Sequence, residues 1–129
     1  MGKSVIIIGA GVVGLACGSE LSKKGYEVFI AEQESYIASQ TSARNSGVIH
    51  AGIYYPSNSL KAKLCTRGKQ LLYKYCEQFG VTYSRTQKLI VATTSDEIQI
   101  LLKLRETAAN NGVVLDLISG QDAIDREPN

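Results

Sequence analysis

The first thirty residues combine two short apolar runs with a segment of helical periodicity. Residues 3–8 are a β-branched apolar run of the kind that is buried on both faces of a parallel sheet. From Val12 to Lys24 the apolar positions recur at helical spacing, and Gly25 predicts the end of that helix. A second apolar run follows at residues 26–31. The pattern predicts a strand–helix–strand unit with a right-handed crossover.

The remaining residues carry stronger helix signals than strand signals. We expect a loop over 33–41 and a short helical turn within 41–47. A long amphipathic helix over 60–79 is predicted to begin after Ser59 and to end at Gly80. A second helix should open with a capping box at 94–97 and run to 109, and a short last helix should follow Ser119. Four short strands are predicted at 48–55, 81–84, 88–93 and 113–118. The chain ends soon after its last helix begins, which is not typical of a natural domain end.

Composition narrows the class of protein. The 129 residues are 44% apolar and 20% charged, as in ordinary globular domains. A net charge of +2 is too small to indicate binding to nucleic acid or to an anionic membrane. Three scattered cysteines without a CxxC pair favour a reducing compartment, and neither a signal peptide nor a membrane span is visible. These features predict a cytoplasmic protein or one attached peripherally to the inner membrane.

Three glycines and an acidic residue follow the two predicted strands in the order that dinucleotide-binding folds use. The turn Gly9-Ala10-Gly11-Val12-Val13-Gly14 is a GxGxxG motif between strand and helix. Its glycines permit a tight turn, close approach of a pyrophosphate, and close packing of helix on sheet. The helix N-terminus then offers free N–H groups and a positive dipole end to the phosphates.

Glu32 stands at the end of the second predicted strand, followed by Gln33. A carboxylate there accepts hydrogen bonds from the ribose hydroxyls and repels a 2′-phosphate, which disfavours NADP. We therefore predict that the chain binds a dinucleotide. The motif does not separate FAD from NAD, and a tight glycine turn without a ligand is the alternative.

Residues 41–55 distinguish an FAD-binding protein from an NAD-binding one. They read Thr-Ser-Ala-Arg-Asn-Ser-Gly-Val-Ile-His-Ala-Gly-Ile-Tyr-Tyr, and the chain continues with Ser-Leu-Lys-Ala-Lys-Leu-Cys at 59–65 and Lys-Leu-Ile-Val-Ala at 88–92. With these three motifs the sequence resembles the D-amino-acid-oxidase-like FAD-dependent oxidoreductases over essentially its whole length. Within that superfamily it is most similar to the L-2-hydroxyglutarate dehydrogenase/oxidase group.

The resemblance implies a role for each matching position. The glycine turn and Glu32 would hold the FAD pyrophosphate and ribose. Thr41, Ser42, Arg44 and Asn45 would contact the pyrophosphate and the ribityl chain, and Ser46, Gly47 and Val48 would approach the isoalloxazine ring. An ordinary solvated loop is the alternative for Arg44 and Asn45.

His50 is the only histidine of the chain. It is the candidate catalytic residue, because an imidazole can accept the hydroxyl proton of a 2-hydroxy acid while the C2 hydride is transferred to flavin N5. A core histidine, a histidine that orients the flavin, and a covalent attachment point for the flavin are the alternatives.

The implied fold is α/β, with a Rossmann-type FAD-binding βαβ unit followed by the start of a β-rich substrate domain. Residues 1–80 would form the first segment of the FAD domain, and residues 81–129 would begin the second domain. The implied reaction is oxidation of L-2-hydroxyglutarate to 2-oxoglutarate, with a quinone or oxygen as the final electron acceptor. The 129 residues alone are expected to bind FAD poorly and to show no turnover.

Three other functions stay open at this point. The first is oxidation of an amino acid, a secondary amine or glycerol phosphate by another member of the superfamily. The second is an NAD-dependent dehydrogenase, and the third is a nucleotide-binding module without catalysis.

Overall fold

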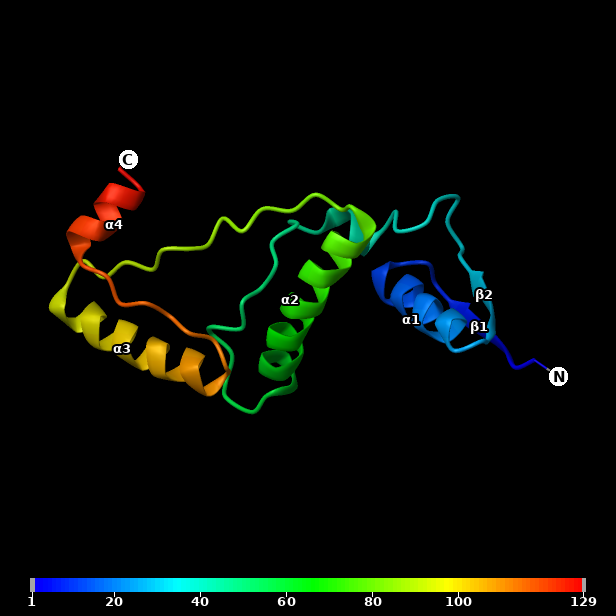
Figure 1. The fold of residues 1–129 in the computed structure, drawn as a ribbon, viewed down its shortest axis with the longest axis horizontal. Helices are drawn as coiled ribbons and strands as arrows, with labels where there is room; N and C mark the ends of the chain where they lie inside the picture. Colours follow the sequence, from blue (N-terminus) through cyan, green and yellow to red (C-terminus); the bar gives the residue numbers. More distant parts are fainter. Residues whose placement is uncertain (1, 129) are drawn as a thin grey trace. The chain divides into compact units, whose positions relative to one another are not determined.

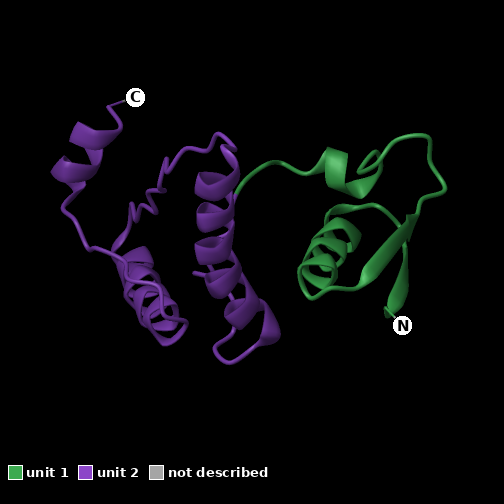
Figure 2. Ribbon diagram, turned by 45° about the vertical axis from the view of Figure 1, so that its right-hand side comes forward, with its two compact units in different colours: residues 1–48 green, residues 49–129 purple. Residues whose placement is uncertain are grey.

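The computed structural model of the chain describes residues 2–128. The chain divides into two compact units, Met1–Val48 and Ile49–Asn129 (Figure 2). Each unit has its own local architecture. The domain boundary predicted at residue 80 stays a prediction.

The first unit is the predicted strand–helix–strand arrangement. Strand β1 (Ser4–Ile8) leads into helix α1 (Val12–Lys23), and strand β2 (Glu27–Ala31) returns parallel to β1 (Figure 1). The register runs from Ser4 opposite Glu27 to Ile8 opposite Ala31, so the two carboxyl ends lie at the same edge. This confirms the α/β class and the Rossmann-type start of the fold.

Helix α1 packs closely on the sheet because a small residue faces the strands. Gly18 is buried, and a Cβ atom at this position would lie 3.1 Å from Ile30 Cδ1 and 3.5 Å from Ile7 Cδ1. The helix ends at Lys23, and Gly25 follows with a positive φ of 81°. Its N–H donates to the carbonyl of Ser22, so a residue that tolerates the left-handed conformation satisfies an otherwise unpaired helix carbonyl.

The second unit is built from three helices whose ends match the predicted signals. Helix α2 (Leu60–Phe79) begins at Ser59, whose hydroxyl accepts from the Ala62 N–H, and ends at the left-handed Gly80. Helix α3 (Ser95–Asn110) has a complete capping box between Thr94 and Glu97, and helix α4 (Gly120–Arg126) has one between Ser119 and Asp122. No helix within residues 2–128 has both the length and the apolar content needed to cross a bilayer.

A small core holds the second unit together. Its buried members are Ile53, Ala108 and Val113, with half-buried apolar neighbours at Ala51, Ile90, Leu104 and Leu115. The side-chain amide of Asn111 adds two hydrogen bonds at this core, to the carbonyl oxygens of Gly52 (3.1 Å) and Tyr55 (2.8 Å). The segment that follows Val48 is thereby fastened to the end of α3.

Four predicted strands are absent from the second unit. Residues 48–55, 81–84, 88–93 and 113–118 do not form a ladder with any other segment between residues 2 and 128, where β1 and β2 make the only sheet. An isolated extended segment has no partner for its N–H and C=O groups, so a strand pattern alone does not create a strand. The strand predictions were therefore wrong for these residues.

Candidate functional site

The glycine turn joins β1 to α1 with contacts that larger residues would prevent. Gly9 has a φ of +95°, and its N–H donates to the Ala31 carbonyl at 2.7 Å. A Cβ atom at Gly14 would lie 2.0 Å from the Gly9 carbonyl oxygen, and one at Gly11 would lie 3.3 Å from Ser42 Oγ. The first and third glycines thus have the predicted roles in the turn and in close packing.

Glu32 is bonded to the turn as well as being available to a ligand. Its Oε2 accepts from the Ala10 N–H at 2.7 Å, and its Oε1 accepts from the Glu34 N–H at 3.0 Å. These two main-chain N–H groups, with a further contribution from the Gln33 N–H, lower the pKa of Glu32. A carboxylate has about four lone-pair positions, so about two remain for the hydroxyls of a ribose.

Residues 38–42 return the chain to the glycine turn. The Ala38 N–H donates to the Ala10 carbonyl at 3.0 Å, and Ala38 adopts a positive φ of 56°. Ser42 follows at the start of the 3₁₀ helix η1 (Thr41–Arg44), and its hydroxyl accepts from the Val12 N–H at 3.0 Å. This N–H is one of the first N–H groups of α1, which have no partner inside the helix.

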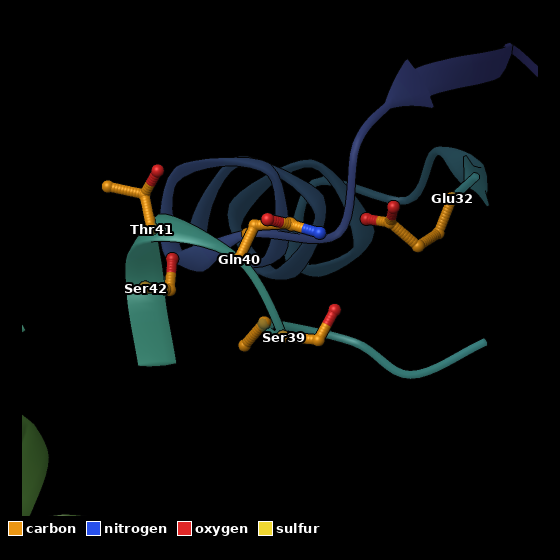
Figure 3. Close-up of a pocket in the computed structure, with 7 residues that line it drawn as sticks. Glu32, Ser39, Gln40, Thr41 and Ser42 are labelled. Carbon is orange, nitrogen blue, oxygen red and sulfur yellow. The ribbon is translucent and has the colours of Figure 1, made fainter. Parts of the chain in front are cut away.

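These contacts border a half-open cavity of about 180 Å³ (Figure 3). Its lining residues are Gly11, Glu32, Ala38, Ser39, Gln40, Thr41 and Ser42. In Figure 3 the Gln40 amide and the Glu32 carboxylate point toward one another. A second hollow of about 500 Å³ lies over the glycine turn and the first turns of α1, and it shares Gly11, Thr41 and Ser42 with the first.

Ser39 is the lining residue that most clearly indicates a ligand. Its hydroxyl oxygen is buried and has no hydrogen-bond partner among residues 2–128. A buried polar atom without a partner destabilises a protein, so such an atom beside a cavity points to a polar group that binds there. Sequence reasoning missed Ala38, Ser39 and Gln40, although the polar run at 39–42 directly precedes the recognised motif.

The predicted residues beyond Ser42 do not line either hollow. The guanidinium of Arg44 donates to the Ser39 carbonyl at 3.2 Å, and the side-chain oxygen of Asn45 accepts from the Gly47 N–H at 2.8 Å. Ser46, Gly47 and Val48 are exposed. Arg44 and Asn45 therefore stabilise the local chain path, and the contacts predicted for them with a cofactor remain predictions.

His50 belongs to the second unit, where it is exposed and pairs with a tyrosine. The distance between His50 Nδ1 and the Tyr55 hydroxyl oxygen is 3.1 Å. The Lys61 ammonium lies 5.0 Å from the centroid of the Tyr55 ring. Within residues 2–128 no group of three or more His, Cys, Asp or Glu side chains is arranged to hold a metal ion.

The amino-acid sequence matches one protein family over nearly all of its length. Residues 4–129 match the family described as FAD dependent oxidoreductase (DAO). The chain belongs to this family. The resemblance predicted from the three motifs is thus confirmed, and the family is one of FAD-dependent enzymes.

Several proteins to which the chain is similar carry the name L-2-hydroxyglutarate dehydrogenase. L-2-hydroxyglutarate dehydrogenase, mitochondrial, from Arabidopsis thaliana is 51% identical over 124 residues, which are 95% of this chain and 26% of that protein. The Homo sapiens protein of the same name is 44% identical over 127 residues (96% and 27%). L-2-hydroxyglutarate dehydrogenase from Indibacter alkaliphilus is 39% identical over 115 residues (88% and 29%). The chain spans about a quarter of the length of these relatives.

The predicted cytoplasmic location is wrong on this comparison. The relatives from Arabidopsis thaliana, Dictyostelium discoideum, Homo sapiens and Mus musculus are named as mitochondrial proteins. The prediction rested on charge, cysteine content and the lack of a visible signal peptide. Those features depend on solubility and redox chemistry, and they do not specify the subcellular compartment of a protein.

The first unit fits the cofactor that its family uses. The glycine turn leaves space above the N-terminus of α1, and Glu32 keeps lone pairs beside the same cavity. The Ser39 hydroxyl, which has no hydrogen-bond partner among residues 2–128, belongs to a lining residue of the same cavity. An adenosine ribose and a pyrophosphate need these groups: a carboxylate, hydroxyls and free main-chain N–H groups.

Proposed function

We propose that this protein binds FAD and oxidises L-2-hydroxyglutarate to 2-oxoglutarate. The observation that carries the proposal is the identity of 39 to 51% with proteins named for that substrate, over 88 to 96% of this chain. The geometry of the first unit supports the cofactor part of the proposal.

In this proposal the adenosine end of FAD binds at the cavity of the first unit. Glu32 accepts hydrogen bonds from the ribose hydroxyls with the lone pairs that Ala10 and Glu34 leave free, and Gln33 lies beside it in the chain. The Ser42 hydroxyl accepts from Val12, so its own hydrogen is available for a phosphate oxygen. Thr41 and Ser39 line the same cavity and add hydroxyl donors.

The pyrophosphate interacts with the N-terminus of α1. The N–H groups of Val13 and Gly14 belong to its first turn, where the helix dipole also favours negative charge. Residues 44–48 are assigned to the ribityl chain and the ring system by the family resemblance. The lining of the cavity supports Thr41 and Ser42 more directly than it supports this later segment.

Oxidation of a 2-hydroxy acid removes a hydride from C2 and a proton from the hydroxyl group. FAD supplies the hydride acceptor when it is bound. His50 accepts the hydroxyl proton in our proposal. Two residues of extended chain span at most about 7 Å, so His50 stays close to Val48, the last residue assigned to the ring.

The small-molecule substrate is a dicarboxylate, and a quinone or oxygen is the proposed final electron acceptor. The test uses the protein expressed from its complete reading frame and purified in air, with its absorbance recorded. A yellow protein whose flavin band bleaches without oxygen on addition of L-2-hydroxyglutarate, but not of its D-isomer, meets the expectation. A colourless protein contradicts the cofactor assignment. A yellow protein that responds instead to an amino acid, an amine or glycerol phosphate contradicts only the substrate.

A further inference from the structure

The segment that carries His50 is held in place at several points. Ile53 is buried in the core of the second unit, and the carbonyl oxygens of Gly52 and Tyr55 both accept hydrogen bonds from the Asn111 amide. A Cβ atom at Gly52 would lie 2.8 Å from Thr66 Cγ2 of α2, which shows how closely the segment approaches that helix. The backbone of Tyr55 is therefore fixed by its surroundings.

The Tyr55 side chain is fixed as well. The Lys61 ammonium lies over one face of its ring, 5.0 Å from the centroid. The hydroxyl at the other end of the ring lies 3.1 Å from His50 Nδ1. Removal from solvent raises the pKa of the Tyr55 phenol, and the proximity of the Cys65 sulfur raises it further. Tyr55 thus keeps its hydrogen at neutral pH.

A neutral phenol has one hydrogen to donate and an oxygen that can accept. His50 Nδ1 is the imidazole nitrogen that pairs with the phenol oxygen, so Nδ1 is not free to take a proton from a substrate. In the proposed function the base is therefore Nε2, and the phenol oxygen accepts the hydrogen that Nδ1 carries. A neutral imidazole can donate at Nδ1 only in the tautomer that carries its proton there, and this tautomer leaves Nε2 with a free lone pair.

We propose that Tyr55 is a positioning residue that accepts the Nδ1–H of His50 and so makes Nε2 the nitrogen that takes the substrate's hydroxyl proton. This inference rests on the proposed function, in which His50 is the proton acceptor. In this arrangement Tyr55 does not touch the reacting atoms. It selects which imidazole nitrogen faces the substrate as a base.

Nuclear magnetic resonance tests the tautomer directly. His50 is the only histidine among the 129 residues, so the chain labelled with ¹⁵N-histidine gives the signals of one imidazole. We expect mainly the Nδ1–H tautomer at a pH where the ring is neutral, although free histidine prefers Nε2–H. Tyr55→Phe should return the ring toward Nε2–H. An Nε2–H majority in the unmodified chain overturns the proposal, and this measurement decides the matter even where the variant does not fold.

Tyr54→Phe is the matched control. Tyr54 is the neighbouring residue, its side chain is 53% exposed, and its ring lies near Lys88 instead of Lys61. The control loses the same hydroxyl group and should leave the tautomer unchanged. Equal shifts in both variants would mean that the effect does not come from the His50–Tyr55 hydrogen bond, and the inference would be abandoned.

Turnover of the protein from the complete reading frame provides the second readout. Removal of the partner that orients a metal-bound imidazole reduces metal affinity or activity by about 10- to 100-fold. By analogy we expect Tyr55→Phe to lower kcat by about 10- to 100-fold with little change in KM. Tyr54→Phe should retain full kcat. Equal kcat for both variants overturns the role of Tyr55 while leaving the proposed function intact. An unmodified protein that does not oxidise L-2-hydroxyglutarate overturns the proposed function instead, and the tautomer measurement then decides on Tyr55 alone.

Discussion

Replacement of Gly14 by alanine tests whether the close approach of α1 to β1 is required. The added Cβ atom would lie 2.0 Å from the Gly9 carbonyl oxygen, about 1.4 Å nearer than the 3.4 Å at which ordinary contact begins. Both sides of this contact are backbone or rigidly attached to it, so no rotamer change can relieve it. Overpacking of this kind destabilises proteins by about 1–3 kcal/mol, and a backbone clash belongs at the upper end. Alanine regains about 1 kcal/mol of helix propensity. We expect a net loss of about 2 kcal/mol in the free energy of unfolding.

Two other glycines inside helices provide the comparison. A Cβ atom at Gly68 of α2 would meet nothing within 4 Å, so Gly68→Ala should stabilise the chain by about 1 kcal/mol. Gly18→Ala should fall between the two, because its nearest neighbour is the flexible end of Ile30 at 3.1 Å. Urea unfolding followed by circular dichroism measures all three. With a slope of about 1–3 kcal/mol per molar urea, Gly14→Ala should lower the midpoint by roughly 1 M. A midpoint for Gly14→Ala at or above that of the unmodified protein would refute the reasoning.

Three further predictions concern single side chains. Main-chain N–H groups lower the pKa of Glu32, so its carboxylate stabilises the folded chain above the ordinary glutamate pKa and loses this effect as pH falls through the lowered pKa. Glu32→Gln should therefore flatten the acid side of a plot of urea midpoint against pH. An unchanged slope would contradict this expectation. Asn111→Ala leaves two carbonyl oxygens without their donor and should lower the free energy of unfolding by about 1–3 kcal/mol, measured by the same urea titration. Ser39→Ala should weaken FAD binding by roughly 2- to 10-fold in a flavin fluorescence titration of the complete protein, without lowering the stability of the FAD-free form. A stability loss without an affinity change would assign Ser39 to the fold instead.

Features specified by neighbouring residues were predictable from the sequence. The capping box formed by Thr94 and Glu97 and the left-handed Gly80 each involve residues a few positions apart, and the structure has both. The glycine turn was predictable for the same reason, because β1, the turn and α1 are contiguous. Its acidic partner Glu32 lies further away, but the length of the crossover helix fixes its position at the end of β2.

Features that depend on distant segments were not predictable from local patterns. The segments 81–84 and 113–118 have strand-like composition, yet no other described segment pairs with them. A segment forms a strand only where a second segment pairs with it. The chain spans about a quarter of the length of its relatives, so it contains few segments that could pair with 81–84 or 113–118. Ser39 was missed because its hydroxyl becomes notable only through burial without a partner, which no sequence pattern records.

The two hydrogen bonds of Asn111 also constrain the order of events during synthesis. They connect the 52–55 segment to a residue 59 and 56 positions later in the chain. Translation at about 5–20 residues per second places roughly 3 to 12 seconds between the appearance of Gly52 and that of Asn111. During that interval Ile53 has neither Ala108 nor Val113 to cover it. The nascent chain therefore exposes this segment to chaperones and proteases until α3 has left the ribosome, whereas the βαβ unit can form from the first 31 residues without waiting.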